Sequence, residues 1–97
     1  MALLEFYGDT CPHCVSMKPM IVKVEKDLGM TIEKLEVWNN DANAEKLSKI
    51  DRGLCGGVPF FYNEEAKTFI CGASDEETVK RWAQGGKGDG IGEALKD

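Results

Sequence analysis

The 97-residue sequence predicts a single α/β domain in which strands and helices follow the order βαβαββα. A short apolar run ends at Gly8, and the segment after it repeats apolar residues every three or four positions, as an amphipathic helix does. Later in the chain, two runs rich in aromatic and β-branched residues flank a turn sequence, which is typical of a β-hairpin. A chain of this length can bury one core and carry one site.

The first strand is expected in the segment LLEFY, residues 3–7. Because its other residues are apolar, the strand should be buried on both faces of the sheet, and Glu5 is an unexpected charge within it. A helix should follow after Thr10 and end at Gly29. Pro12 falls in the first turn of that helix, where a missing N–H costs nothing, whereas Pro19 falls in the interior and should kink it.

The segment TIEKLEVW, residues 31–38, predicts a second strand. Because a helix crosses over between the two strands, the second should lie parallel to the first. Residues 39–50 begin with Asn and Asp side chains that suit a helix cap, and they continue with apolar residues along one helical face. The sequence RGLCGG, residues 52–57, should end this second helix.

The hairpin is expected over residues 58–72, with its turn at residues 63–65. Ser74 and Glu77 form a capping-box pattern, so a last helix should begin at this point. That helix should stop at Gly85.

The composition limits the extent of the folded domain and the kinds of partner that it can bind. We expect a folded domain over residues 1–85 and a flexible, glycine-rich tail over residues 86–97. The net charge is −5, which disfavours nucleic-acid phosphates and anionic lipids as partners. The start, MALLEFYGDT, lacks the basic segment of a signal peptide and the apolar length of a membrane span. Four cysteines are fewer than a disulfide-stapled secreted scaffold of this size carries, which favours an intracellular protein with functional thiols. We expect a monomer in the cytoplasm that binds neither nucleic acid nor membranes.

Cys11 and Cys14 stand two residues apart in GDTCPHC, with Pro12 and the chain's single histidine, His13, between them. This spacing serves either a disulfide that opens and closes or a pair of metal ligands. At the start of a helix, unpaired N–H groups and the helix dipole stabilise a thiolate at Cys11, which favours the redox chemistry. His13 can add a positive charge or a hydrogen-bond donor to the sulfur.

Several segments together resemble the thioredoxin superfamily. LEFYGDTCPHC is similar to the active-site segment of protein disulfide isomerases, in which an acid, here Glu5, stands six positions before the first cysteine. Pro19 matches the proline that kinks the active-site helix of thioredoxins. GVPFFY resembles the loop in which the family places a cis-proline opposite its cysteine pair, which makes Val58–Pro59 the expected cis bond. FICGASDEE is similar to the glutaredoxin segment that receives part of glutathione.

The resemblance covers residues 2–84 and implies a thioredoxin-like fold, with a four-stranded mixed sheet flanked by helices. It implies a thiol–disulfide oxidoreductase that acts on protein disulfides or glutathione mixed disulfides and is reset by a thiol reductant or a reductase. Glutathione is a candidate co-substrate, and no bound cofactor or metal is expected. Thr10 stands where thioredoxins usually carry a tryptophan. The substrate-binding residues would be Thr10, Val58, Pro59, Gly72 and Asp75.

In this scheme Cys11 is the exposed nucleophile, and Cys14, one helical turn later, is the buried thiol that resolves the mixed disulfide. Glu5, among apolar neighbours, should be buried with a raised pKa and should take the proton from Cys14 during exchange. The backbone of Val58 would offer β-type hydrogen bonds to an extended substrate. Specificity would then depend little on the substrate's side chains.

Two further cysteines remain. Cys71 ends an apolar strand and is expected to be a small buried apolar residue rather than a reactive thiol. Cys55 lies in a glycine-rich loop four residues before Pro59, where it could act as a regulatory or metal-binding thiol.

Three alternatives stay open. A metal carrier would hold Cu(I) with two thiolates, or zinc with Cys11, His13, Cys14 and Cys55. An iron–sulfur glutaredoxin would use Cys11 and glutathione as cluster ligands across a dimer. A redox-inactive module would keep the fold and bind partners through the edge at Val58. The intact cysteine pair argues against this last alternative.

Overall fold

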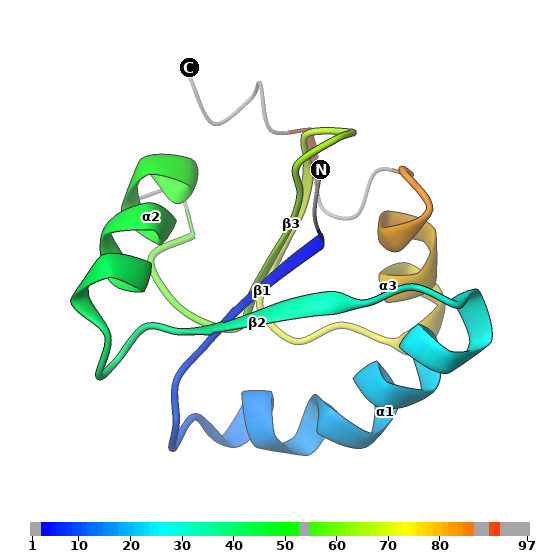
Figure 1. Cartoon of the computed structure of the whole chain (residues 1–97), viewed down its shortest axis with the longest axis horizontal. Helices are drawn as coiled ribbons and strands as arrows, with labels where there is room; N and C mark the ends of the chain where they lie inside the picture. The colour runs from blue at the N-terminus through cyan, green and yellow to red at the C-terminus, as the bar shows by residue number, and fades with distance from the viewer. Residues whose placement is uncertain (1–2, 53–54, 87–89, 92–97) are drawn as a thin grey trace.

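The computed structural model describes residues 3–52, 55–86 and 90–91 (Figure 1). Its elements in chain order are β1 (Leu3–Tyr7), α1 (Pro12–Leu28), β2 (Ile32–Glu36), α2 (Asp41–Asp51), β3 (Phe60–Asn63), β4 (Thr68–Cys71), α3 (Glu76–Ala83) and β5 (Gly90–Ile91). The strands form one sheet in the spatial order β2-β1-β3-β4-β5. β1 pairs parallel with β2 and antiparallel with β3, and β3 pairs antiparallel with β4. The predicted order βαβαββα and the mixed sheet built from its four strands are therefore confirmed.

The fifth strand is an addition that the sequence did not predict. Gly90 and Ile91 pair with Phe69 and Thr68 at the edge of β4, although both fall in the segment that was expected to be a flexible tail. A strand of two residues is too short to show any periodicity within a glycine-rich sequence. Of the other residues predicted for that tail, Gly86 is described, and residues 87–89 and 92–97 lie outside the described residues.

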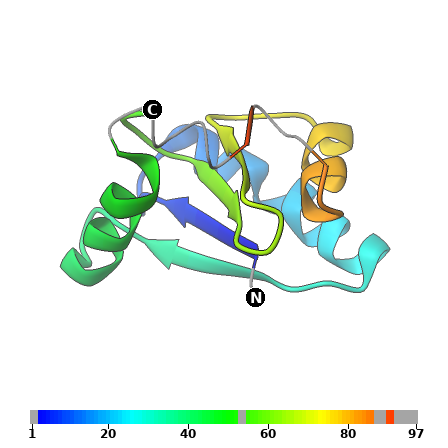
Figure 2. The same cartoon turned by 90° about the horizontal axis from the view of Figure 1, so that it is seen from above.

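Side chains of β1 alternate between two apolar cores. Leu3 packs in the core beneath α1 and α3, whereas Leu4 and Phe6 pack in the core on the side of α2. Figures 1 and 2 show the same division, with α1 and α3 together on one face of the sheet and α2 on the other. Because alternate residues of a strand share a face, Glu5 lies with Leu3 on the face covered by α1.

Trp82 of helix α3 joins the helix to the sheet through two hydrogen bonds. Trp82 is fully buried, and its indole N–H donates to the carbonyl oxygen of Thr68 at 3.1 Å. Its own carbonyl accepts from the side-chain amide of Asn63 at 3.1 Å. Trp82 and Phe60 are core residues, as expected, whereas Tyr7 is only half-buried. Among the described residues, no helix has both the length and the apolar character needed to cross a bilayer.

Candidate functional site

Cys11 and Cys14 form a disulfide at the N-terminus of α1, with their Cα atoms 5.2 Å apart. Cys11 is the N-cap residue of the helix, and its Sγ accepts a hydrogen bond from the backbone N–H of Cys14 at 3.2 Å. A sulfur thus occupies the place of the oxygen that usually caps a helix. Pro12 takes the first helical position, as expected. The N–H of Cys14 therefore points at the Cys11 sulfur at the positive end of the helix dipole, where it would stabilise negative charge.

The two cysteines are more similar in burial than expected. Cys11 retains 4% of its accessible surface and Cys14 retains 1%. Cys14 is buried as predicted, but Cys11 is not the exposed side chain that the sequence suggested. The reason is the second loop: the carbonyl oxygen of Val58 lies 3.9 Å from the Sγ of Cys11. The sulfur therefore sits against the backbone edge that was expected to bind substrate.

The residues that flank the pair are open to solvent. His13 is exposed, and within the described part of the chain its imidazole makes no hydrogen bond; its carbonyl oxygen accepts from the Ser16 hydroxyl at 3.0 Å. Thr10, immediately before Cys11, is exposed as well. The assistance of His13 to the sulfur and the contact of Thr10 with substrate stay predictions.

The Val58–Pro59 peptide bond is cis, which confirms the expectation drawn from the resemblance. Pro59 is buried, and its carbonyl oxygen accepts a hydrogen bond from the N–H of Gly72 at 2.8 Å. Gly72 has a φ of 90°, a conformation that glycine adopts without steric cost. The structure thus brings Val58, Pro59 and Gly72 together, with Val58 beside Cys11.

Asp75 is the N-cap residue of α3. Its carboxylate accepts a hydrogen bond from the backbone N–H of Thr78 at 2.8 Å, and hydrogen bonds from the side chain and backbone of Thr78 lower its pKa. The helix is therefore capped by Asp75, not by Ser74 as the capping-box pattern suggested. Both residues suit an N-cap, and the sequence alone could not rank them. A role for Asp75 in binding a ligand stays a prediction.

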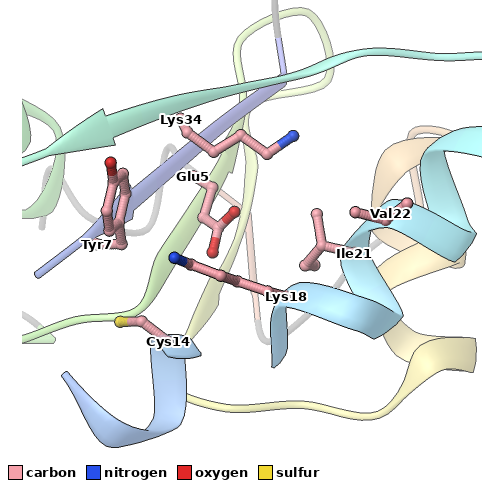
Figure 3. A pocket seen from close by; sticks show the side chains of 7 residues that line it. All are labelled: Glu5, Tyr7, Cys14, Lys18, Ile21, Val22 and Lys34. Carbon is pink, nitrogen blue, oxygen red and sulfur yellow. The ribbon is translucent and has the colours of Figure 1, made fainter. Parts of the chain in front are cut away.

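A cavity of about 270 Å³ lies between β1 and α1 (Figure 3). It is lined by Glu5, Tyr7, Cys14, Lys18, Ile21, Val22 and Lys34. Glu5 is 4% exposed, and burial raises its pKa from the ordinary 4.5 to about 7, against the lowering effect of the Lys34 and Lys18 charges. This confirms the expected buried acid. The cavity is large enough for water and has Glu5 and Cys14 among its lining residues. Proton transfer from Cys14 to Glu5 stays a prediction.

Two lysines beside Glu5 were missed by the sequence analysis. Lys34 stands opposite Glu5 in the β1–β2 register, although its ammonium pairs with Glu25. Lys18 follows Cys14 by one turn of α1, and in Figure 3 its side chain extends toward Glu5. Signals for both existed in the sequence: neighbouring parallel strands place residues side by side, and positions i and i+4 share a helix face.

Cys55 and Cys71 form a second disulfide, with Cα atoms 5.7 Å apart. Cys71 is exposed, so the prediction that it is a buried apolar residue is wrong, and Cys55 is a half-buried disulfide partner rather than a free thiol. Cys71 shares the α2 face of β4 with Phe69, and the loop after α2 brings Cys55 to that face. A sequence separation of 16 residues gives no signal for this pairing.

Glu36, at the end of β2, is a further residue that was missed. Its carboxylate accepts backbone N–H groups from Asp9 and Trp38, both at 3.0 Å, and from Asn39 at 2.8 Å. Desolvation raises its pKa, but the backbone hydrogen bonds from Asn39, Asp9 and Trp38 outweigh that effect and lower it. A Cβ added to Gly8 would overlap the indole of Trp38. The turn before Cys11 is therefore held by Glu36 at the end of β2 and by Trp38 just after it.

The residues that were considered for zinc do not gather. In the described ranges there is no group of three or more His, Cys, Asp or Glu side chains placed to hold a metal ion. Cys11 and Cys14 bond to each other, Cys55 bonds to Cys71, and His13 faces solvent.

Comparison with known proteins agrees with this geometry. The sequence profile of the Thioredoxin family matches residues 1–84. A thioredoxin of Rickettsia bellii (strain RML369-C) is 29% identical to the chain over 80 residues, which cover 82% of this chain and 75% of that protein. The match spans β1 to α3, and thus includes both the cysteine pair and the cis-proline loop.

Proposed function

We propose that this chain, a disulfide oxidoreductase that belongs to the thioredoxin family, acts on protein disulfides presented as extended segments. The observation that carries this proposal is the position of the Cys11 sulfur. It caps α1 and lies 3.9 Å from the carbonyl oxygen of Val58, next to the cis-proline. An extended chain that pairs with the backbone of Val58 would bring its own disulfide to that sulfur.

The first step uses the reduced pair. The Cys11 thiolate, stabilised by the N–H groups of the first helical turn, attacks one sulfur of the substrate disulfide. A new S–S bond joins Cys11 to the substrate, and the second substrate sulfur leaves as a thiolate that takes a proton from solvent. The thiolate of Cys11 is favoured by its place at the helix cap.

The second step uses Cys14 and Glu5. Glu5, with a pKa of about 7, is half ionised at neutral pH, and such a group is well matched to remove a proton from a thiol. The Cys14 thiolate then attacks the Cys11 sulfur and releases the reduced substrate. Two electrons pass to the substrate, and Cys11 and Cys14 are left as a disulfide. A thiol reductant or a reductase restores the dithiol.

The helix cap also bears on the direction of electron flow. Stabilising the Cys11 thiolate stabilises the reduced pair, so it makes the disulfide form a stronger oxidant of its partners. Whether the chain mainly reduces or oxidises proteins is therefore set by its reduction potential. Cytoplasmic placement and a monomeric state stay predictions.

Two assays and one titration test the proposal. Reduced protein is offered insulin in one assay and a glutathione mixed disulfide in the other, and the Cys11–Cys14 pair is titrated against glutathione. We expect turnover of insulin that is abolished by Cys11→Ser. Turnover of the glutathione mixed disulfide alone would assign the chain to the glutathione-dependent class. Failure of both, with metal bound to the purified protein, would favour the carrier.

A further inference from the structure

The Cys55–Cys71 disulfide lies at the start of the loop that carries Val58, which runs from Cys55 to Pro59. Cys71 stands opposite Phe60 in the β3–β4 register, and the next residue, Gly72, donates to the carbonyl oxygen of Pro59. The disulfide then ties the start of the same loop to the same end of β4. The loop from Cys55 to Pro59 is thus closed into a ring against β4.

A buried carboxylate secures the start of this loop. Asp51, the last residue of α2, is 5% exposed and accepts backbone N–H groups from Cys55 at 2.6 Å and from Gly56 at 3.0 Å. Asp51 and the disulfide together fix the entry to the loop, while Phe60 and Pro59 fix its exit.

Between these anchors, the two glycines have open space around them. Gly56 has a φ of 76°, and a Cβ added at Gly56 or Gly57 would meet no atom within 4 Å. Glycine loses more conformational freedom on ordering than any other residue. The two glycines therefore take their conformation from the fixed start of the loop. Val58 packs against the core on the side of α2, so its position against Cys11 depends both on that packing and on the start of the loop.

We propose that the Cys55–Cys71 disulfide positions the Val58 edge for substrate, and that its reduction by a dithiol weakens the capture of extended disulfide substrates. This regulation rests on the function proposed above. Cys71 is exposed and so accessible to a thiol from solution. One thiolate of the dithiol bonds to the Cys71 sulfur and displaces Cys55 as a thiolate. The second thiolate of the reagent then attacks the reagent sulfur that is bonded to Cys71. This closes the reagent's own disulfide and releases Cys71 as a thiolate, so Cys55 and Cys71 together gain two electrons and, after protonation from solvent, two protons.

The test needs Cys11 as a free thiol while the second disulfide stays closed. A Cys14→Ser chain purified without reductant meets both conditions, and it is compared with the same chain that also carries Cys55→Ser and Cys71→Ser. Each reacts with an extended peptide whose single cysteine is capped by thionitrobenzoate, and the released chromophore gives the rate. Iodoacetamide, which is too small to use the Val58 edge, serves as the matched control, with modification of Cys11 read by peptide mass mapping.

With the disulfide removed, the rate with the peptide should fall roughly tenfold. A tenfold loss corresponds to the free-energy cost of ordering about one residue on binding. The rate with iodoacetamide should stay the same. Equal peptide rates in the two chains would overturn the proposal. If Cys11 in the parent chain reacts with neither reagent, it is the proposed function that fails. Should the triple variant not fold, the Cys14→Ser chain after reduction with a dithiol replaces it, and the same comparison decides.

Discussion

The carboxylate of Glu36 accepts the backbone N–H of Asp9 at 3.0 Å, which joins the end of β2 to the turn that carries the reactive sulfur. The same turn is closed by a hydrogen bond from the N–H of Cys11 to the carbonyl oxygen of Gly8 at 3.1 Å. Trp38, on the segment that Glu36 also holds, covers Gly8. The N-cap geometry of Cys11 thus depends on a side chain outside the cysteine motif.

Glu36→Ala should slow the alkylation of Cys11, because the turn before it loses an anchor on Asp9. We expect a decrease between about threefold and thirtyfold, since misplacing a reacting group by ~1 Å can cost about a hundredfold. Glu36→Gln, which keeps one acceptor oxygen, should fall between the alanine variant and the wild type. Iodoacetamide kinetics on the reduced protein measure the effect, with Glu33→Ala on the exposed side of β2 as the control. Equal rates in all variants would contradict this role.

Glu5→Gln should stabilise the fold in alkaline solution. Burial raises the pKa of Glu5 from 4.5 to about 7, so the folded state holds this proton more tightly than the unfolded state does. Stability is therefore lost as pH rises from about 4.5 to 7, by roughly 3 to 4 kcal/mol at about 1.4 kcal/mol per pH unit. Urea unfolding should show the glutamine variant more stable at pH 8 and equal to the wild type at pH 4. A constant difference at both pH values would refute the assignment.

Lys18→Met should move the pH dependence of the second exchange step upward. The Lys18 charge lowers the pKa of Glu5, so its removal leaves the carboxyl protonated to higher pH. Because Lys18 is exposed, we expect a shift of less than about one pH unit. The release of peptide from a preformed mixed disulfide, followed against pH, measures it. Lys18→Arg should restore the profile and Lys26→Met should leave it unchanged; an identical profile for Lys18→Met would count against an electrostatic role.

Removal of the Cys55–Cys71 disulfide by a double serine substitution should lower the free energy of unfolding. A disulfide that closes a loop of this length restricts the unfolded chain by about 3 kcal/mol. Urea unfolding without reductant gives the difference between wild type and variant. In the presence of a dithiol that opens the bond, the two proteins should unfold at nearly the same urea concentration. A difference that persists there would point to the serine side chains instead of the bond.

Most of the fold was predictable because its signals are local. The spacing of apolar residues gave α1 its length, and the apolar run before Gly8 gave β1. The resemblance added the cis bond at Pro59, which no local pattern could supply. β5 was missed because its two residues, in a glycine-rich segment, carry no periodic signal.

The parts of the site that were missed depend on contacts between distant segments. The bond between Glu36 and Asp9 spans 27 positions, and the disulfide of Cys55 with Cys71 spans 16. Neither pairing follows from spacing along the chain. Cys11 was expected to be exposed for the same reason, since its cover comes from the loop at Val58, 47 positions away. Only the folded chain brings these groups together.

In the reduced protein the cap of α1 should hold Cys11 as a thiolate. The rate at which iodoacetamide modifies Cys11 in the fully reduced protein, followed from pH 4 to 10 with peptide mass mapping, measures the pKa of this thiol. We expect the midpoint of that curve to lie well below the value of an ordinary free thiol, about 8.5. A midpoint at the ordinary value, with Cys11 reacting no faster than Cys55 or Cys71 at neutral pH, would show that the helix cap does not stabilise the thiolate.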